Sequence, residues 1–214
     1  MSSPSSRAKP VSRPAELAAT ARALQHAAGR RIVIGITGQP GAGKSTVAER
    51  LAADLGHGAV LVPMDGFHLP QATLERLGSR DRMGAPDTFD VHGYATLLAE
   101  LRSPAPATAP GFDRAIEEPV ADAIAIPAAT DIVVTEGNYL LLETGGWETV
   151  RPLLDAVWYV TLEDDIRVGR LIARHVAFGK TLEAATAWAN GPDAANAALI
   201  AGTSGRADLV FAGK

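Results

Sequence analysis

The chain has 214 residues, 47% of them hydrophobic, which is long enough for one domain with a sizeable core. Its 20 basic and 24 acidic residues give a net charge of −4, which argues against a general nucleic-acid-binding protein. It has no cysteine and no apolar run near the roughly 20 residues that span a bilayer, so we expect a cytoplasmic protein without disulfides, thiolate metal sites or a membrane partner.

Residues 1–14 are rich in Ser, Pro and Arg and are typical of a flexible tail, which leaves 15–214 as one domain. Short β-branched runs further along predict strands that are buried on both faces, and apolar residues at helical spacing separate them. In chain order we expect a helix at 15–28, a strand at 31–37, a helix at 44–55, a strand at 58–65, a helix at 90–102, strands at 131–137 and 155–163, helices at 164–179, 182–190 and 193–201, and a strand at 207–211.

The segment 103–110, SPAPATAP, is expected to be a loop, because proline removes backbone donors and fixes φ. For residues 117–127, EEPVADAIAIP, the sequence leaves open a β-strand excursion or a β-hairpin. Strands that alternate with helices favour a parallel sheet, because parallel strands need crossover connections. Right-handed crossovers place helices on both faces, which predicts a three-layer α/β domain with five main strands.

Gly38, Gly43, Lys44 and Ser45 fit the pattern G-x-x-x-x-G-K-[ST] between a predicted strand and a predicted helix. Glycine lets backbone amides turn inward around an anion, and the helix adds its positive N-terminal end. Lys44 would supply a charge for the β- and γ-phosphates, and the Ser45 hydroxyl a ligand for Mg²⁺. An ordinary glycine turn is the alternative. We expect ATP and Mg²⁺ to be held by Gly38, Gln39, Pro40, Gly41, Ala42, Gly43, Lys44, Ser45 and Thr46.

Two carboxylates follow buried strands, Asp65 in VPMDGFHLP and Glu136 in VVTEGNYLL. Ligands of open parallel sheets sit beyond the carboxyl ends of the strands, so both side chains should face the phosphates. One could accept a proton from an acceptor hydroxyl and the other could hold Mg²⁺ through a water, and which is closer to Mg²⁺ stays open. Helix capping is the alternative for each. His68 follows Asp65 by three residues and is placed to hydrogen-bond a substrate.

Arg167, Arg170 and Arg174 recur at helical spacing on one face of the predicted helix 164–179. Phosphoryl transfer needs cationic donors, and a lid at about 167–200 would bring them to the substrate. The alternative is that these arginines form a solvated charged face. For Arg167 the two interpretations are equally supported, whereas for Arg170 and Arg174 we favour a functional role. The nearby Trp188 is interpreted as a packing residue.

Five motifs follow one another along the chain: GQPGAGKST, MDGFH, GAPDTFD, TEGNYLL and RLIARH. Together they resemble the P-loop kinase family of uridine kinase, bacterial type I pantothenate kinase and phosphoribulokinase. That family includes members described as fructose-transport-system kinases. The resemblance covers about 31–211 and implies a P-loop NTPase domain with a five-stranded, mainly parallel sheet and a small helical lid. It implies Asp65 as the catalytic base, acting with Lys44, Arg170 and Arg174, and Glu136 near Mg²⁺. It further implies an acceptor pocket with Asp87, Phe89 and Asp90 on one wall and Phe112, Asp113 and Arg114 on another. From their places in the sequence, His68 and Glu136 are added to the expected substrate contacts.

One position of the pocket motif departs from uridine kinases. They carry an acid two residues before its proline, where it holds the ribose diol, whereas Gly84 stands here and RMGAPDTFD resembles the pantothenate kinase stretch. The resemblance implies transfer of the ATP γ-phosphoryl group to a hydroxyl of a small metabolite: a nucleoside, a sugar or a pantothenate-like alcohol. The rival is a nucleotide switch or assembly ATPase with a protein partner. Whether the chain forms a homodimer stays open.

Overall fold

The computed structural model describes residues 14–213, so residues 1–13, nearly all of the predicted tail, lie outside the described residues. The strands of the central sheet are β1 (Ile32–Gly38), β2 (Ala59–Pro63), β5 (Ile132–Glu136), β6 (Ala156–Thr161) and β7 (Leu209–Ala212). The helices are α1 (Pro14–Ala28), α2 (Lys44–Leu55), α3 (Gln71–Arg76), α4 (Val91–Glu100), α5 (Asp164–Ala177), α6 (Leu182–Asn190) and α7 (Pro192–Ala201). No helix within residues 14–213 combines the length and the apolarity needed to cross a membrane.

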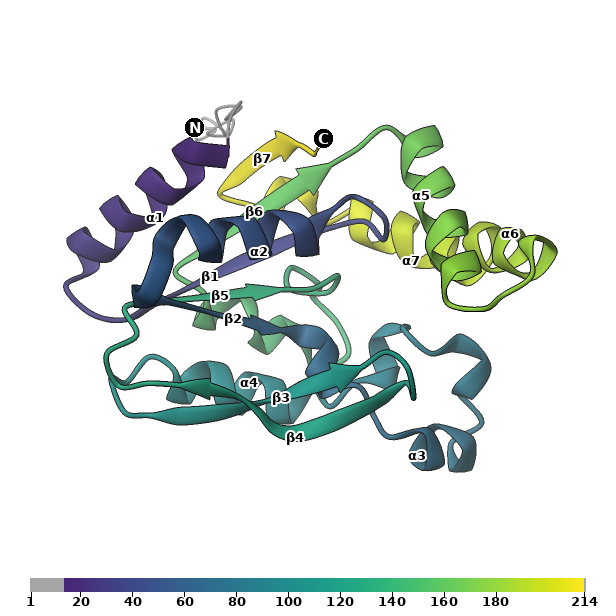
Figure 1. Cartoon of the computed structure of the whole chain (residues 1–214), viewed down its shortest axis with the longest axis horizontal. Coiled ribbons are helices and arrows are strands. Elements are labelled where there is room, and N and C mark those ends of the chain that lie inside the picture. The colour runs from purple at the N-terminus through teal and green to yellow at the C-terminus, as the bar shows by residue number, and fades with distance from the viewer. Residues whose placement is uncertain (1–13, 214) are drawn as a thin grey trace, which may run out of the picture.

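The sheet has the strand order β2-β5-β1-β6-β7, and every neighbouring pair is parallel. Apolar side chains form two core clusters, one on each face of this sheet. In the first, Leu51 of α2 packs with Ile34 of β1, and α1 lies beside α2 (Figure 1). In the second, Val33 of β1 packs with Leu98 of α4 and Ile200 of α7. Successive β1 residues therefore point to opposite cores, which confirms the predicted five-stranded, three-layer α/β class.

Residues 107–126 form an antiparallel hairpin outside the central sheet, made of β3 (Ala107–Asp113) and β4 (Glu118–Ile126). The predicted loop at 103–110 is therefore wrong over residues 107–110, and the hairpin considered around 117–127 is present. Pro110 is tolerated in β3 because the register shifts between Ala109 and Gly111. A residue at such a bulge does not need to donate a backbone hydrogen bond to the partner strand, and proline has no N–H to donate.

One buried guanidinium ties both flanks of this hairpin to the core. Arg31, 3% exposed, donates from Nη1 to the Ala105 carbonyl oxygen before β3 at 3.0 Å. Its Nη2 donates to the Pro127 carbonyl oxygen after β4 at 2.8 Å, and its Nε to that of Thr130 at 2.8 Å. These acceptors satisfy a charge that would otherwise be costly to bury. The hairpin is thus anchored at its base, and its tip reaches the carboxyl edge of the sheet (Figure 1).

Candidate active site

The loop 39–43 joins β1 to α2 and is shaped by glycines that meet two different demands. Gly43, which precedes α2, has a φ of 92°, in the left-handed region where glycine is favoured. Gly38 lies against the backbone of β6, and a Cβ there would overlap the Val160 carbonyl oxygen. The first amides of α2 have no partner inside the helix and, with the helix dipole, favour an anion in front of the loop.

Lys44 and Glu136 are both buried beside this loop. Lys44 is 8% exposed and donates from Nζ to the Gln39 carbonyl oxygen at 3.2 Å. Burial lowers the pKa of Lys44 to about 8, although the charges of Glu136 and Asp65 oppose that effect. Glu136 is 6% exposed, and burial, reinforced by the Asp65 charge, raises its pKa. The site therefore favours ligands that restore both charges: an anion at the ammonium and a cation at the carboxylate.

Ser45 connects the loop to the end of β5, because its Oγ donates to Glu136 Oε1 at 2.9 Å. The two residues are 91 positions apart in the chain, yet the strand order places β1 and β5 next to each other. A hydroxyl and a carboxylate oxygen in contact are the kind of ligands that a hard cation prefers.

Asp65 lies in the turn that follows β2 and forms an ion pair with Arg114 across the cavity. The distance from Arg114 Nη2 to Asp65 Oδ2 is 2.6 Å, and the Arg114 side chain, at the turn between β3 and β4, is 49% exposed. His68 lies nearby between two rings, with its centroid 4.0 Å from that of Phe89 and 4.9 Å from that of Phe112. Burial lowers the pKa of His68, which favours the neutral imidazole.

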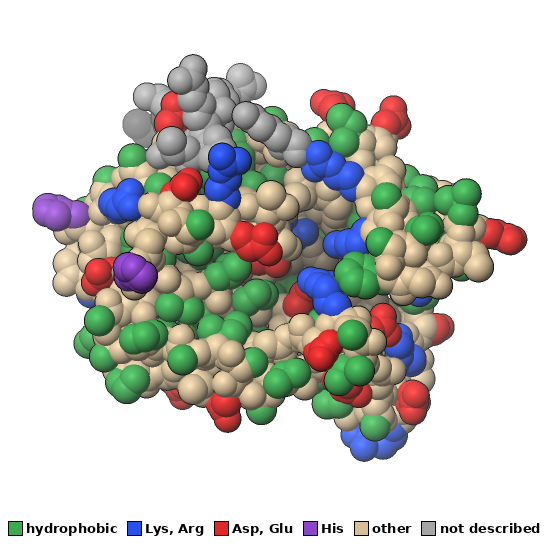
Figure 2. All heavy atoms as spheres, viewed as in Figure 1, with side chains coloured by type: hydrophobic (Ala, Val, Ile, Leu, Met, Phe, Trp, Pro, Cys, Tyr) green, Lys and Arg blue, Asp and Glu red, His purple; other side chains and the backbone are tan. Residues whose placement is uncertain are grey.

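These groups face one cavity of about 160 Å³, at the carboxyl edge of the sheet. Figure 2 shows Lys and Arg side chains gathered around a hollow between the central domain, the hairpin and the helices at the far end. The cavity is lined by Pro40, Lys44, Ser45, Asp65, His68, Met83, Gly84, Phe89, Arg114, Glu136, Gly137, Asn138, Arg174, His175, Trp188, Asp193 and Asn196. The predicted residues that it brings together are Pro40, Lys44, Ser45, Asp65, His68, Phe89, Arg114, Glu136 and Arg174.

The three arginines of α5 all approach the loop or the cavity, but in different ways. Arg174 lines the cavity, and Arg170 Nη1 would lie 3.7 Å from a Cβ placed on Gly43. Arg167 is 5% exposed, donates from Nη1 to the Pro40 carbonyl oxygen at 3.2 Å and pairs with Asp164. The solvated alternative is therefore wrong for Arg167, which packs against the loop.

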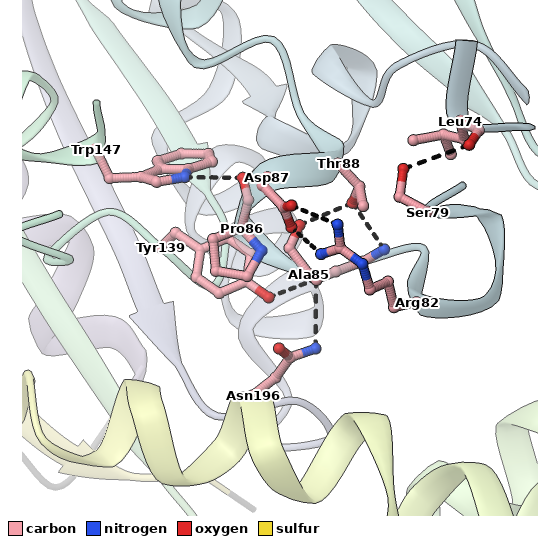
Figure 3. Close-up of polar contacts among 11 residues, drawn as sticks. Leu74, Ser79, Arg82, Ala85, Pro86, Asp87, Thr88, Tyr139, Trp147 and Asn196 are labelled. Carbon is pink, nitrogen blue, oxygen red and sulfur yellow. Dashed lines mark hydrogen bonds and ion pairs between the residues drawn. The ribbon is translucent and has the colours of Figure 1, made fainter. Parts of the chain in front are cut away.

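The loop that carries PDTFD is held by donors from distant parts of the chain (Figure 3). Tyr139 Oη and Asn196 Nδ2 both donate to the Gly84 carbonyl oxygen, the latter at 3.4 Å. Trp147 Nε1 donates to the Pro86 carbonyl oxygen at 3.0 Å. Because Asn196 belongs to α7, this loop is bonded directly to the far wall of the cavity, and Gly84 has no side chain to fill the space between them.

Asp87, a predicted substrate contact, does not line the cavity. Its carboxylate forms a bidentate pair with Arg82, with Nη2 and Oδ2 2.6 Å apart, and this hydrogen bond lowers the pKa of Asp87 (Figure 3). Asp90 from the same motif caps α4 by accepting from the Gly93 amide at 2.9 Å. We therefore leave both carboxylates out of the acceptor site.

The cavity also contains residues that the sequence analysis did not assign. His175 Nε2 and Asp193 Oδ2 are 2.8 Å apart and join α5 to α7. Asn138 and His175 both lay inside the motifs TEGNYLL and RLIARH, which was the signal that could have found them. Trp188, interpreted as a packing residue, lines the cavity as well. Asp193 gave no sequence signal beyond its place at a helix start.

Known proteins are similar to the part of the chain that carries this site. A sequence model of the Phosphoribulokinase / Uridine kinase family matches residues 33–213. The ATP-dependent kinase-like protein notR' of Aspergillus versicolor is 37% identical over 133 residues, which cover 58% of this chain and 77% of that protein. Protein YggC of Escherichia coli strain K12 is 34% identical over 188 residues, or 85% of this chain and 77% of YggC.

A crystal structure from Silicibacter sp. TM1040 is also similar, and its protein is provisionally described as a fructose transport system kinase. It superposes with a TM-score of 0.81 at 34% identity and covers 91% of this chain and 98% of its own.

Proposed function

The chain belongs to the phosphoribulokinase / uridine kinase family and is a small-molecule kinase, and on that premise we propose that it transfers the γ-phosphoryl group of ATP to a hydroxyl of a small metabolite. The observation that carries the proposal is the shared cavity. Lys44 and Ser45 of the phosphate loop face Asp65 and Arg174 across one small space. A phosphoryl group held by Lys44 and Ser45 thus lies in the same cavity as the Asp65 carboxylate, which can receive a proton.

The loop and Lys44 hold the triphosphate in the proposed mechanism. The backbone amides at the start of α2 bind the β- and γ-phosphate oxygens. The negative charge of the phosphates favours the protonated form of Lys44, which burial disfavours. Arg170 and Arg174 supply further cationic donors from α5. Charge on the transferring group is thereby offset where it develops, which is the main catalytic contribution in phosphoryl transfer.

Asp65 orients the acceptor hydroxyl and accepts its proton. As the acceptor oxygen forms a bond to the γ-phosphorus, the bond from that phosphorus to the bridging oxygen breaks, and its electron pair leaves on ADP. The acceptor is thereby converted to its phosphate ester. Glu136 accepts a hydrogen bond from Ser45 of the phosphate loop. We therefore assign Glu136 to Mg²⁺ rather than to the acceptor hydroxyl.

Ser45 and Glu136 are the residues that would hold Mg²⁺, Glu136 through a water. Within residues 14–213 no group of three or more His, Cys, Asp or Glu could form a metal cage. That fits Mg²⁺, which keeps several waters and is bound largely by substrate phosphates rather than by an all-protein cage. When bound, the ion neutralises charge on the β- and γ-phosphates.

The helices α5 and α6 form the proposed lid. The lid expected at about 167–200 included α7, but Ile200 of α7 is buried in the core and Gln39 of the loop donates to the Ala197 carbonyl oxygen at 3.3 Å. We therefore assign α7 to the fixed wall. The pair between His175 and Asp193 joins the lid to that wall, so closure excludes water that would otherwise compete as acceptor.

The experiment that tests the proposal compares Asp65→Asn with Asp87→Asn, a change to a carboxylate outside the cavity. The first change should lower the rate of phosphoryl transfer by about 10²–10⁴-fold, which is the contribution of a general base. Nucleotide affinity should stay within about threefold, or roughly 0.65 kcal/mol. Asp87→Asn should leave both quantities unchanged. Full transfer activity in Asp65→Asn would remove the base assignment.

A nucleotide switch or assembly ATPase is separated from a kinase by its response to metabolites. Release of ADP is measured with and without a panel of nucleosides, ketoses and pantothenate, and the phosphorylated product is identified by mass spectrometry. A kinase releases ADP in proportion to a new phosphate ester. A switch gains nothing from any metabolite.

A further inference from the structure

The carboxylate assigned as the base is engaged by a guanidinium. Arg114 Nη2 lies 2.6 Å from Asp65 Oδ2, although the residues are 49 positions apart and follow strands of two different sheets. In that pair one oxygen of Asp65 accepts from Arg114 and is not available to an incoming hydroxyl. The guanidinium therefore competes with an incoming hydroxyl for that oxygen of Asp65.

Arg114 lines the cavity from the hairpin turn, and the acidic side chains beside it bond elsewhere. Asp113 Oδ1 accepts from the Ala115 amide at 2.8 Å, and Glu117 pairs with Arg80. Glu118 faces α3, where it accepts from the Gln71 amide at 3.3 Å. None of these three carboxylates, which lie in the turn or directly beside it, is bonded to Arg114 within the described residues.

The other cationic side chains of the cavity lie on its phosphate side. Lys44 belongs to the loop, and Arg174 belongs to the helix that also places Arg170 beside that loop. Arg114 instead stands on the hairpin, next to the aromatic group around His68. Bound ATP would occupy the first set and would leave Arg114 as the cation that faces the acceptor.

We propose that the acceptor carries an anionic group, a carboxylate or a phosphate, in addition to the hydroxyl that is phosphorylated. Arg114 binds this group by charge-assisted hydrogen bonds, and in doing so it leaves Asp65 free to accept the hydroxyl proton. The cavity of about 160 Å³, part of which the γ-phosphate would fill, suits a small acceptor. The inference rests on the proposed function and narrows its substrate class.

The test uses pairs of acceptors that differ mainly in the anionic group. Glycerate is compared with glycerol, pantothenate with panthenol, and ribulose 5-phosphate with ribulose, and the formed ester is measured with ATP in excess. In the active pair, the anionic member should have a kcat/KM at least about tenfold higher, which is about 1.4 kcal/mol. The carboxylate and phosphate arms separate the two sources of the anion.

Variants of Arg114 distinguish recognition from a structural tether. Arg114→Gln should raise the KM of the anionic acceptor about 10–100-fold and should not lower turnover of the neutral member of the pair, since only the anion loses a partner. Arg114→Lys should recover part of the loss. Arg82→Gln, at an exposed arginine outside the cavity, is the matched control and should keep the wild-type preference.

The outcomes separate this inference from the proposed function. Transfer to a neutral acceptor in preference to its anionic partner would overturn the inference and leave the kinase assignment intact. An equal loss on both members in Arg114→Gln would show that the arginine only positions Asp65, and would also overturn it. Release of ADP without any ester from any acceptor would overturn the proposed function, and the inference with it.

Discussion

Protonation of Lys44 should be coupled to nucleotide binding, and the coupling should grow with pH. Burial lowers the pKa of this side chain from 10.5 to about 8, which corresponds to about 3 kcal/mol against the charged form at 1.36 kcal/mol per pH unit. Nucleotide phosphates in contact with the ammonium favour the charged form and raise its pKa again. Binding must therefore draw a proton from solution whenever Lys44 is neutral beforehand.

The size of this uptake follows from the pKa of the free protein. With a pKa of about 8, the neutral fraction of Lys44 is roughly 0.1 at pH 7, 0.5 at pH 8 and 0.9 at pH 9. The number of protons taken up per nucleotide should follow the same rise. Affinity should fall about tenfold for each pH unit above 8, because binding then needs protonation of the lysine. The nucleotide itself contributes little at pH 8 and pH 9, since phosphate has its second pKa near 6 and is almost fully ionised there.

The assay is isothermal titration calorimetry with ADP, in two buffers of different ionisation enthalpy and with EDTA present. EDTA removes divalent ions, which would otherwise draw a proton from Glu136. Any uptake by Glu136 itself, whose pKa is raised from 4.5, falls as pH rises and so has the opposite pH dependence. Lys44→Arg keeps a permanent charge and should abolish the rising uptake. Lys180→Met, at a lysine that lies 4.6 Å over the Trp188 ring, should retain it.

Two results would refute this reasoning. An uptake below about 0.1 proton at both pH 8 and pH 9 would mean that Lys44 is fully charged before nucleotide arrives. An unchanged, rising uptake in Lys44→Arg would mean that another group supplies the effect. In either case burial would not control the charge of the loop lysine.

Two further predictions concern the stability of the hairpin and of α5, measured as the free energy of unfolding in urea. Gly66→Ala should destabilise the protein by about 1–3 kcal/mol, because a Cβ there would overlap the Pro110 carbonyl oxygen and lie 2.7 Å from the carbonyl carbon. Gly169→Ala, in α5 with open space around it, should instead stabilise the protein by about 0.5–1 kcal/mol. Equal effects of the two substitutions would contradict this prediction. Arg31→Met should cost at least about 2 kcal/mol, because it strips the partners from several buried carbonyls, whereas Arg22→Met, at an exposed arginine, should cost little; a loss below 0.5 kcal/mol in Arg31→Met would go against the anchoring role.

The sheet and the phosphate loop could be predicted from the sequence because their signals are local. The helix expected at 44–55 has those bounds in the structure, and the strand before it ends at Gly38 within one residue of its expected end. A rule about strand ends also placed Asp65 and Glu136 at one edge, where both line the cavity. Each of these inferences uses residues that are neighbours in the chain or a topology that alternation alone implies.

The remaining features depend on contacts between distant segments, which spacing does not encode. Helical periodicity put Arg167 on a face with two other arginines but could not show that the Pro40 carbonyl lies against it. Asp87 was assigned to the pocket by motif position, whereas a local pair with Arg82 turns it away. The strand at 107–110 was missed because the proline rule ignores bulges in a ribbon with free edges.

The anchoring of the β3–β4 ribbon has an evolutionary consequence. The ribbon leaves the α/β body and rejoins it at carbonyls that one guanidinium gathers, and it shares no strand pairing with the five-stranded sheet. Such an insert can be exchanged for one of another length or charge through recombination at two chain positions, while the phosphate-handling half keeps its shape. Diversification of acceptors among relatives could proceed by swapping this module, with the chemistry inherited unchanged.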